Sequence, residues 1–262
     1  GSAWALAKTV FDALGAQVRC IGVSPDGTNI NAECGSTRPE RLCELVRLHS
    51  LDLGFAFDGD ADRCICVAER GEVVDGAGIL WVCAKDMHER GELGGGGVVT
   101  TVVSNGGLAR ALERSGILCT RTQVGDKYVA EEMARRGALL GGEPSGHIVF
   151  RKYATTGDGI LTALRVAEIV LERKCPLSFL TRGYVPLPQK KRDVPVPGGA
   201  AILEREDVRA AIARAQGEDV RMVVRASGTE PVVRIFGEGG AAAAGGALRR
   251  VERAVRAAAE AR

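Results

Sequence analysis

Helical and strand-like hydrophobic patterns alternate through the first quarter of the chain. Apolar residues from Trp4 to Leu14 recur at helical spacing, and Gly15 is placed to cap the end of that helix. The elements predicted next are a strand over 17–23, a helix over 38–50, a strand over 51–57 and a returning strand over 64–68. This alternation predicts an α/β unit with a largely parallel sheet.

The middle of the chain continues with strand-to-helix units. The predicted elements are a strand over 98–103, a helix through 112, a strand over 118–124, a helix near 129–136 and a further apolar-striped helix beyond 158. Between the last two helices, an apolar pair at 139–140 leads into a glycine-bounded turn over 141–147. We therefore expect a second α/β domain here.

The carboxyl-terminal segment has a different texture. Prolines and basic residues over 186–197 are typical of a linker. Beyond it, residues 220–224 and 232–236 read as paired strands flanking a polar loop, and the last helix carries one apolar stripe. The pattern predicts a small α+β domain whose stripe packs on its own sheet.

Composition is that of an ordinary globular protein. Hydrophobic residues make up 45% and charged residues 26% of the 262 positions, and the formal net charge of +2 gives no reason to expect nucleic acid or an acidic membrane as a partner. No apolar run approaches the roughly 20 residues of a membrane span, so we expect a cytoplasmic protein. The eight cysteines are scattered without C-x-x-C spacing, which favours free structural thiols over zinc or disulfides.

An acidic loop directly follows the strand predicted over 51–57. Asp58, Asp60 and Asp62 alternate along it and Arg63 closes it, so the loop predicts a divalent-cation site in which carboxylate oxygens hold Mg²⁺. With Glu69 the same aspartates also match positions 1, 3, 5 and 12 of a calcium-binding EF-hand loop. Arg63 stands where that loop requires glycine, and a strand-like pattern precedes it instead of a helix. A solvated acidic turn without metal is the third interpretation.

Three other loops carry chemically useful side chains. Arg225, Ser227, Gly228 and Thr229, with Arg234 beyond them, suit a phosphate, although a polar hairpin with a structural Arg–Glu pair has the same composition. Glu143, Ser145 and His147 alternate through a turn and offer groups for a hydroxyl-rich ligand such as a sugar; the alternative is a simple hydrogen-bonded turn. Lys127 is either a solvated surface charge or a group for proton transfer.

Taken in order, these four loops resemble those of the α-D-phosphohexomutase family. DGDADR resembles the family's magnesium loop, VGDKY the loop with a basic residue, GGEPSGH the sugar-recognition loop and RASGTEPVVR the phosphate-binding loop. The segments NINAECGS, ATTGDGI and SGTEP favour the branch that acts on glucosamine phosphate. A sister mutase acting on glucose or mannose phosphates, and a non-catalytic sugar-phosphate-binding remnant, are the alternatives.

The resemblance implies interconversion of glucosamine 6-phosphate and glucosamine 1-phosphate through a phosphoserine and a bisphosphorylated sugar. It implies that Mg²⁺ is held by Asp58, Asp60 and Asp62, that Arg63 lies against the transferring group, and that Lys127 is a general acid or base. The sugar would be held by Glu143, Ser145 and His147. The non-reacting phosphate would be held by Arg225, Ser227, Gly228, Thr229 and Arg234.

The chain also departs from the family pattern. The Ser-His-Asn-Pro type motif that carries the phosphorylated serine in the family's first domain does not occur in these residues, so we expect a missing amino-terminal domain and no turnover by this chain alone. The resemblance divides the chain into a truncated domain two over 1–72, domain three over 73–184 and domain four over 185–262. The first of these also lacks the family's first strand and is expected to be the least stable.

Overall fold

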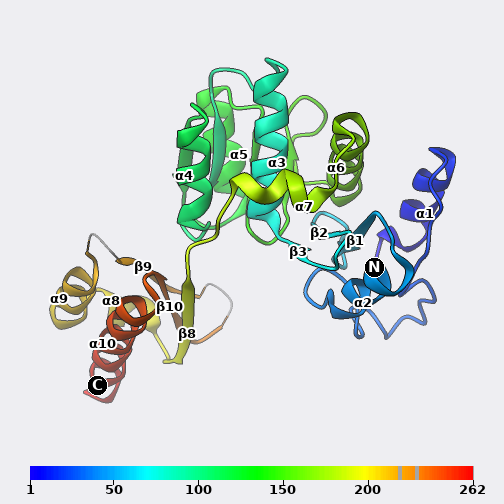
Figure 1. Ribbon diagram of the computed structural model, residues 1–262. Helices are drawn as coiled ribbons and strands as arrows, with labels where there is room; N and C mark the ends of the chain where they lie inside the picture. The colour runs from blue at the N-terminus through cyan, green and yellow to red at the C-terminus, as the bar shows by residue number, and fades with distance from the viewer. Residues whose placement is uncertain (218–219, 228–229, 262) are drawn as a thin grey trace. The chain divides into compact units, whose positions relative to one another are not determined.

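The chain folds into two units, each built around its own hydrophobic core (Figure 1). The computed structural model describes residues 1–217, 220–227 and 230–261. Unit 1 comprises residues 1–104 and 108–185, and unit 2 comprises residues 105–107 and 186–262. The domain boundary expected between residues 72 and 73 falls inside unit 1. One hydrophobic core cluster contains residues from both sides of this boundary. The three-domain division stays a prediction.

Unit 1 contains two sheets and most of the helices. Its helical elements are α1 (Ala3–Ala13), α2 (Glu40–His49), α3 (Gly76–Glu89), α4 (Gly106–Arg114, whose first two residues group with unit 2), α5 (Asp126–Arg136), α6 (Gly159–Arg173), α7 (Leu177–Leu180) and the 3₁₀ turn η1 (Thr181–Gly183). Its strands are β1 (Leu53–Phe57), β2 (Cys64–Ala68), β3 (Val73–Val74), β4 (Val98–Thr101), β5 (Cys119–Thr122), β6 (Leu140–Gly142) and β7 (Ile148–Phe150).

The first sheet has the order β1-β2-β3 and is antiparallel throughout. The expected largely parallel sheet is therefore wrong for this part of the chain, because the short acidic loop between β1 and β2 can only return the chain antiparallel. The strand expected over 17–23 is also wrong: among the described residues this segment pairs with no other strand, and a strand is stable only when its backbone groups are paired.

The second sheet has the order β5-β4-β6-β7, with β4, β5 and β6 parallel and β7 antiparallel. Side chains alternate between its faces, as the pleat requires. Val99 and Val149 pack with α5, whereas their neighbours Val98 and Ile148 belong to the larger cluster that contains α3. Strands and helices thus combine in the second α/β domain expected for this part of the chain. Helix α3 itself was missed from the sequence, because it is buried on nearly every face and shows no amphipathic stripe.

Helix α1 is attached to the rest of unit 1 by few contacts. Phe11 stacks on Phe55 of β1 with 5.4 Å between ring centroids, and Ser2 N–H donates to Gly59 O. Trp4 and Leu6 remain about half exposed. The described helices include none that is both long enough and apolar enough to cross a lipid bilayer.

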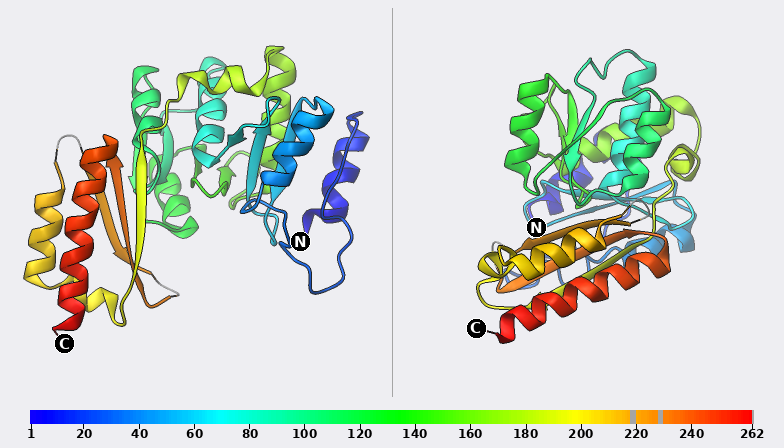
Figure 2. Two further views of the ribbon diagram at one scale, coloured as in Figure 1. Left: turned by 60° about the horizontal axis from the view of Figure 1, so that its bottom comes forward. Right: turned by 90° about the vertical axis from the view of Figure 1, so that its left-hand side faces the viewer.

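Unit 2 is a three-stranded antiparallel sheet covered by helices. Its elements are β8 (Gln189–Pro195), α8 (Gly199–Leu203), α9 (Glu206–Ala215), β9 (Val220–Ala226), β10 (Val232–Gly239) and α10 (Ala241–Glu260), and the strand order is β8-β10-β9. Figure 2 shows α9 and α10 side by side against the sheet. The stripe predicted on the last helix is confirmed by buried Leu248, Val251, Val255 and Ala258.

The linker expected over 186–197 is wrong, because most of it forms β8. This strand lies at the edge of the sheet, where basic residues and proline are common because they discourage pairing with other chains. Four consecutive residues of this seven-residue strand, Lys190 to Asp193, are exposed, whereas Val194 is fully buried. The sequence of an edge strand thus lacks a strong hydrophobic signal.

Candidate functional site

The acidic loop is a tight turn that joins β1 to β2. The Asp58 carboxylate closes it by accepting a hydrogen bond from Arg63 N–H at 3.2 Å, and Ala61 N–H donates to Asp58 O at 3.3 Å. Ala61 has a positive φ of 62°, a conformation that costs a non-glycine residue energy and that the surrounding hydrogen bonds enforce. The turn therefore holds its carboxylates on a fixed backbone.

Asp58 and Asp62 approach each other closely, with Arg63 beside both. The Arg63 Nε atom lies 3.6 Å from Asp58 Oδ2 and 3.8 Å from Asp62 Oδ1. Partial burial and the hydrogen bond shared with Asp62 raise the pKa of Asp58. Burial also acts on Asp62, but its hydrogen bonds with Asp58 and His147 and the nearby Arg63 charge outweigh burial and lower the pKa of Asp62. The opposite directions of these shifts make Asp62 the more acidic of the two carboxyl groups.

His147 connects this loop to the β6–β7 hairpin. Its ring is buried, its Nδ1 lies 3.0 Å from Asp62 Oδ2, and its Nε2 accepts a hydrogen bond from Gly157 N–H at 3.1 Å. An isolated antiparallel bridge pairs His147 with Arg63, and Cys64 N–H donates to Gly146 O at 3.0 Å. Residues 85 apart in sequence are therefore fastened together by both backbone and side chains.

Two glycines that the sequence analysis left without a role complete this arrangement. A Cβ at Gly157 would lie within 2.6 Å of the His147 ring, and a Cβ at Gly159 would lie 2.5 Å from Arg63 O. Gly159 N–H also donates to Ala61 O at 2.9 Å. The signal was present in the segment TTGDGI, but a glycine pair reveals close packing only once its neighbours are known.

The predicted sugar-recognition residues lie on the hairpin turn between β6 and β7. Glu143 N–H donates to His147 O at 2.9 Å, and one carboxylate oxygen of Glu143 accepts from Gly125 N–H at 3.1 Å. Ser145 is exposed at the turn. The structure therefore links this turn to the acidic loop through His147 and to the Gly125–Lys127 segment through Glu143.

Lys127 carries an exposed side chain at the start of α5. Its side chain is 76% exposed, and its Nζ lies 3.8 Å from Glu131 one helical turn further along α5. Its backbone N–H is held by the Asp126 carboxylate at 2.7 Å. The segment that carries Lys127 is thus fixed at Gly125 and Asp126, while the amino group itself extends into solvent.

The described residues contain no group of three or more histidine, cysteine or acidic side chains already converged as a metal cage. Asp58 and Asp62 converge, whereas Asp60 is exposed on the same turn. With both carboxylates ionised, buried Asp62 Oδ1 has no hydrogen-bond donor in the described part of the chain. Magnesium usually takes only one or two protein carboxylates and keeps several waters, so this donor set fits Mg²⁺.

The geometry of the loop contradicts the EF-hand interpretation. Glu69, which would be its bidentate ligand, lies beyond the whole of β2 and accepts hydrogen bonds from the Ser178 hydroxyl and from Ser178 N–H, the latter at 3.3 Å. Strands flank the acidic loop on both sides, where an EF-hand has helices.

In unit 2, the predicted phosphate loop joins β9 to β10. Arg225 and Arg234 are opposite residues on these strands, and the turn is closed by Ser227 N–H donating to Val232 O at 2.9 Å. Ser227 also accepts from Glu230 N–H at 3.3 Å. Arg234 pairs with Glu230 and lies 3.9 Å from Asp193, so the structural Arg–Glu pair considered for this loop exists. Gly228 and Thr229 lie outside the described residues.

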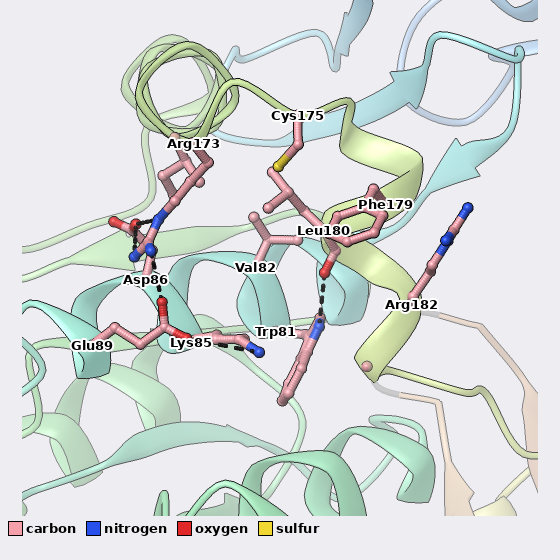
Figure 3. Close-up of a pocket in the computed structure, with 12 residues that line it drawn as sticks. Trp81, Val82, Lys85, Asp86, Glu89, Arg173, Cys175, Phe179, Leu180 and Arg182 are labelled. Atoms are coloured by element: carbon pink, nitrogen blue, oxygen red, sulfur yellow. Dashed lines mark hydrogen bonds and ion pairs between the residues drawn. The ribbon is translucent and has the colours of Figure 1, made fainter.

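A cavity of about 360 Å³ in unit 1 is lined by none of these loop residues (Figure 3). Its walls come from α3, α6, α7 and η1 and include Trp81, whose indole N–H donates to Leu180 O. Arg173 on its wall pairs with Asp86 at 2.7 Å and with Glu89 at 2.8 Å. Because none of the predicted site residues lines this cavity, we assign the candidate site to the loops.

Three family models match the chain in sequence order. Residues 1–71 match the alpha/beta/alpha domain II of phosphoglucomutase/phosphomannomutase, residues 75–186 match its alpha/beta/alpha domain III, and residues 184–256 match its C-terminal domain. Phosphoglucosamine mutases of Lachnospira eligens and Symbiobacterium thermophilum are 54% and 50% identical to the chain over 92% and 91% of its length. The match covers 54% of each of those proteins, so the chain spans about half the length of the curated relatives it matches.

Solved structures show the same fold. A phosphoglucomutase/phosphomannomutase family protein from Burkholderia thailandensis superposes with a TM-score of 0.81 at 25% identity, over 98% of this chain and 58% of its own. Aspergillus fumigatus N-acetylphosphoglucosamine mutase, solved in complex with GlcNAc-6P and magnesium, superposes with a TM-score of 0.72 at 23% identity, over 89% of this chain and 58% of its own.

Proposed function

Because the chain belongs to the phosphoglucomutase/phosphomannomutase family, we propose that it supplies the cation, sugar and phosphate sites of a phosphoglucosamine mutase. Such an enzyme interconverts glucosamine 6-phosphate and glucosamine 1-phosphate. The observation that carries the proposal is the connected network in unit 1. There the Asp62–His147 and Glu143–Gly125 contacts join the acidic loop, the sugar-recognition turn and the Lys127 segment.

The acidic loop is the proposed centre of phosphoryl transfer. Asp58, Asp60 and Asp62 would hold Mg²⁺, which when bound supplies positive charge to phosphoryl oxygens. Arg63, exposed beside the carboxylates, would contact a phosphoryl group with the rest of its guanidinium. Positioning and charge stabilisation of this kind supply most of the catalysis in phosphoryl transfer.

Recognition of the sugar phosphate falls to the other loops. One carboxylate oxygen of Glu143 accepts from Gly125 N–H, and the second oxygen could accept from a sugar hydroxyl. The exposed Ser145 hydroxyl could likewise bind a sugar hydroxyl. Lys127 is the proposed general acid or base. In unit 2, Arg225 and Arg234 suit the non-reacting phosphate together with Ser227, Gly228 and Thr229 of the same loop.

The proposed role of these residues is binding and positioning, because they contain no Ser-His-Asn-Pro type motif to act as phosphoryl donor. We expect the purified chain to bind glucosamine 6-phosphate more tightly than glucose or mannose 6-phosphate in calorimetric titrations. In ³¹P NMR it should form no glucosamine 1-phosphate by itself. Fusing the amino-terminal half of the Lachnospira eligens relative in front of it should restore turnover.

The proposal fails if all three sugar phosphates bind no better than inorganic phosphate. It also fails if the unfused chain converts glucosamine 6-phosphate to the 1-phosphate, because a different phosphoryl donor would then be at work. A fusion that turns over glucose 6-phosphate in preference would transfer the assignment to a sister mutase.

A further inference from the structure

We propose that His147 is a positioning residue, which fixes Asp62 as a ligand with one available oxygen and thereby favours small octahedral cations such as Mg²⁺ over Ca²⁺. The inference rests on the proposed function only in assuming that the acidic loop binds a divalent cation. It assigns His147 a role different from the sugar contact that the family resemblance implies.

The protonation of the His147 ring follows from its hydrogen bonds. A peptide N–H can only donate, so Nε2, which accepts from Gly157 N–H at 3.1 Å, must be the unprotonated nitrogen. In the neutral ring the proton then resides on Nδ1, from which it is donated to Asp62 Oδ2 at 3.0 Å. Both ring nitrogens are therefore in use, and neither is available to a sugar hydroxyl.

The position of the ring is determined by its surroundings as well as by these two hydrogen bonds. The side chain is only 4% exposed. Gly157 packs so closely on it that a Cβ would lie 2.5–2.6 Å from three ring atoms. The backbone bridge between His147 and Arg63 fixes the other side of the contact. A ring held in this way orients its carboxylate partner, as second-shell groups do at metal sites.

The consequence for Asp62 is that its two oxygens are no longer equivalent. Oδ2 is occupied by the His147 N–H, whereas buried Oδ1 has no hydrogen-bond donor among the described residues and lies 3.8 Å from Arg63 Nε. Magnesium requires near-octahedral geometry with short bonds to single oxygens, while calcium takes more ligands and often a bidentate carboxylate. An Asp62 restricted to one oxygen suits the former ion.

The tautomer of His147 gives a direct test that needs no metal and no activity. The chain has three histidines, and the other two, His49 and His88, are exposed. In ¹H–¹⁵N correlation spectra of the metal-free chain near neutral pH, one imidazole should show a protonated Nδ1 and an unprotonated Nε2, and its signals should disappear in His147→Asn. If the imidazole lost in that variant instead carries its proton on Nε2, the hydrogen-bond assignment and the proposal are wrong.

Metal affinity tests the consequence. In His147→Asn, the amide nitrogen can stand near the place of Nδ1 and keep the donor to Asp62, whereas His147→Gln places its amide near Nε2. We expect His147→Gln to lower Mg²⁺ affinity roughly 10–100-fold and Ca²⁺ affinity much less, while His147→Asn keeps most of the Mg²⁺ preference. Gly157→Ala, which displaces the ring, should behave like His147→Gln, and His88→Asn should leave both affinities unchanged.

The outcomes separate this inference from the proposed function. Failure of the native chain to bind any divalent cation would overturn both the inference and the cation site of the proposed function. Normal Mg²⁺ binding with equal losses for Mg²⁺ and Ca²⁺ in His147→Gln would overturn only the selectivity role. Circular dichroism of each variant identifies any that is unfolded, and the tautomer measurement on the native chain decides the proposal in that case.

Discussion

Arg225 and Arg234 stand directly opposite each other on the antiparallel strands β9 and β10. Opposite residues share one face of a sheet, and like charges in that position destabilise it. Arg234 is compensated by Glu230 and Asp193, whereas no carboxylate pairs with Arg225 in the described part of the chain. A phosphate bound between the two guanidinium groups would convert this repulsion into charge-assisted hydrogen bonding.

Truncation of Arg225 should therefore have opposite effects with and without ligand. We expect Arg225→Ala to leave the thermal stability of the free chain unchanged or slightly raised, because it removes a like-charge contact. The same change should weaken binding of glucosamine 6-phosphate by roughly 1.5–3 kcal/mol, as measured by calorimetry. Arg234→Ala should weaken binding similarly, but it should also remove the ion pairs of Arg234 with Glu230 and Asp193.

Arg209 provides the control for this experiment. It is an exposed arginine of the same unit, 3.5 Å from an equally exposed Glu204. Arg209→Ala should change neither stability nor ligand affinity by a measurable amount. Equal loss of affinity in Arg209→Ala and Arg225→Ala would mean that the ligand senses only general positive charge.

Mg²⁺ should bind to the acidic loop, but weakly, because Asp58, Asp60 and Asp62 all come from one short turn and cannot surround an octahedral ion. Asp60→Ala should lower the affinity about tenfold or more in calorimetric titrations, a loss of at least roughly 1.4 kcal/mol. Asp52→Asn removes an exposed carboxylate just before β1 and should have no effect. Identical heats for the native chain and Asp60→Ala would remove this loop from consideration as a metal site.

The elements predicted well from sequence are those whose pattern depends on one neighbouring surface. The strand expected over 64–68 is β2 to the residue, because a short apolar run is bounded on both sides by turn residues. The last helix was recognised from a single stripe, and that stripe is its buried face. In both cases the local sequence contains nearly all the information that the structure uses.

The failures share a different cause: each concerns a segment whose environment lies far away in sequence. Helix α3 is buried from several sides and has no polar face, while β8 is an edge strand whose polarity resembles a linker. Residues 17–23 have strand-like composition but no partner strand among the described residues. Pairing and burial are tertiary facts, so pattern alone could not distinguish these cases.

The candidate site shows the same division. Alternating aspartates predicted a cation loop, and the structure holds Asp58 and Asp62 together on that turn. The spacing of residues could not predict that Asp62 contacts His147 or that Gly157 donates to the same ring, because the three residues belong to different loops. The predicted roles of Lys127 and Ser145 depend on a ligand and stay predictions.

Stability of unit 2 should depend on pH through Glu238. This carboxylate is buried, which by itself would raise its pKa, but hydrogen bonds from Arg221, Gly106 N–H and Gln189 outweigh burial and lower the pKa below its ordinary value of 4.5. A depressed folded pKa stabilises the folded state above about pH 4.5, and this contribution is lost as the pH falls through the folded value.

Glu238→Gln should consequently destabilise unit 2 by about 1–3 kcal/mol at pH 7, because it removes the negative charge that accepts the hydrogen bond of Arg221. The difference from the native chain should shrink as the pH is lowered below 4.5. Hydrogen exchange of β10 peptides at several pH values measures this, and Glu204→Gln, at an exposed carboxylate, is the control. A pH-independent difference would show that Glu238 acts through packing and not through its charge.

The amino-terminal segment should be the least protected part of unit 1. Residues 15–39 contain no helix or strand, and helix α1 leaves Trp4 about half exposed. Such regions open locally at low free-energy cost. Strands β1 and β2, in contrast, are paired along their full length, and β2 is completely buried. We therefore expect fast amide exchange over residues 3–39 and slow exchange over 53–68 and 98–170.

The stack of Phe11 on Phe55 should decide how firmly α1 is held, because it is the aromatic contact between this helix and β1. Phe11→Ala removes that contact and should accelerate exchange throughout α1 while leaving residues 98–170 unchanged. Leu6→Ala is the matched control, since Leu6 lies on the same helix but is 56% exposed, and it should change little. Equal protection over 3–39 and 98–170 in the native chain would contradict the expected local opening. Equal effects of the two substitutions would mean that α1 is anchored elsewhere, at its Ser2–Gly59 hydrogen bond.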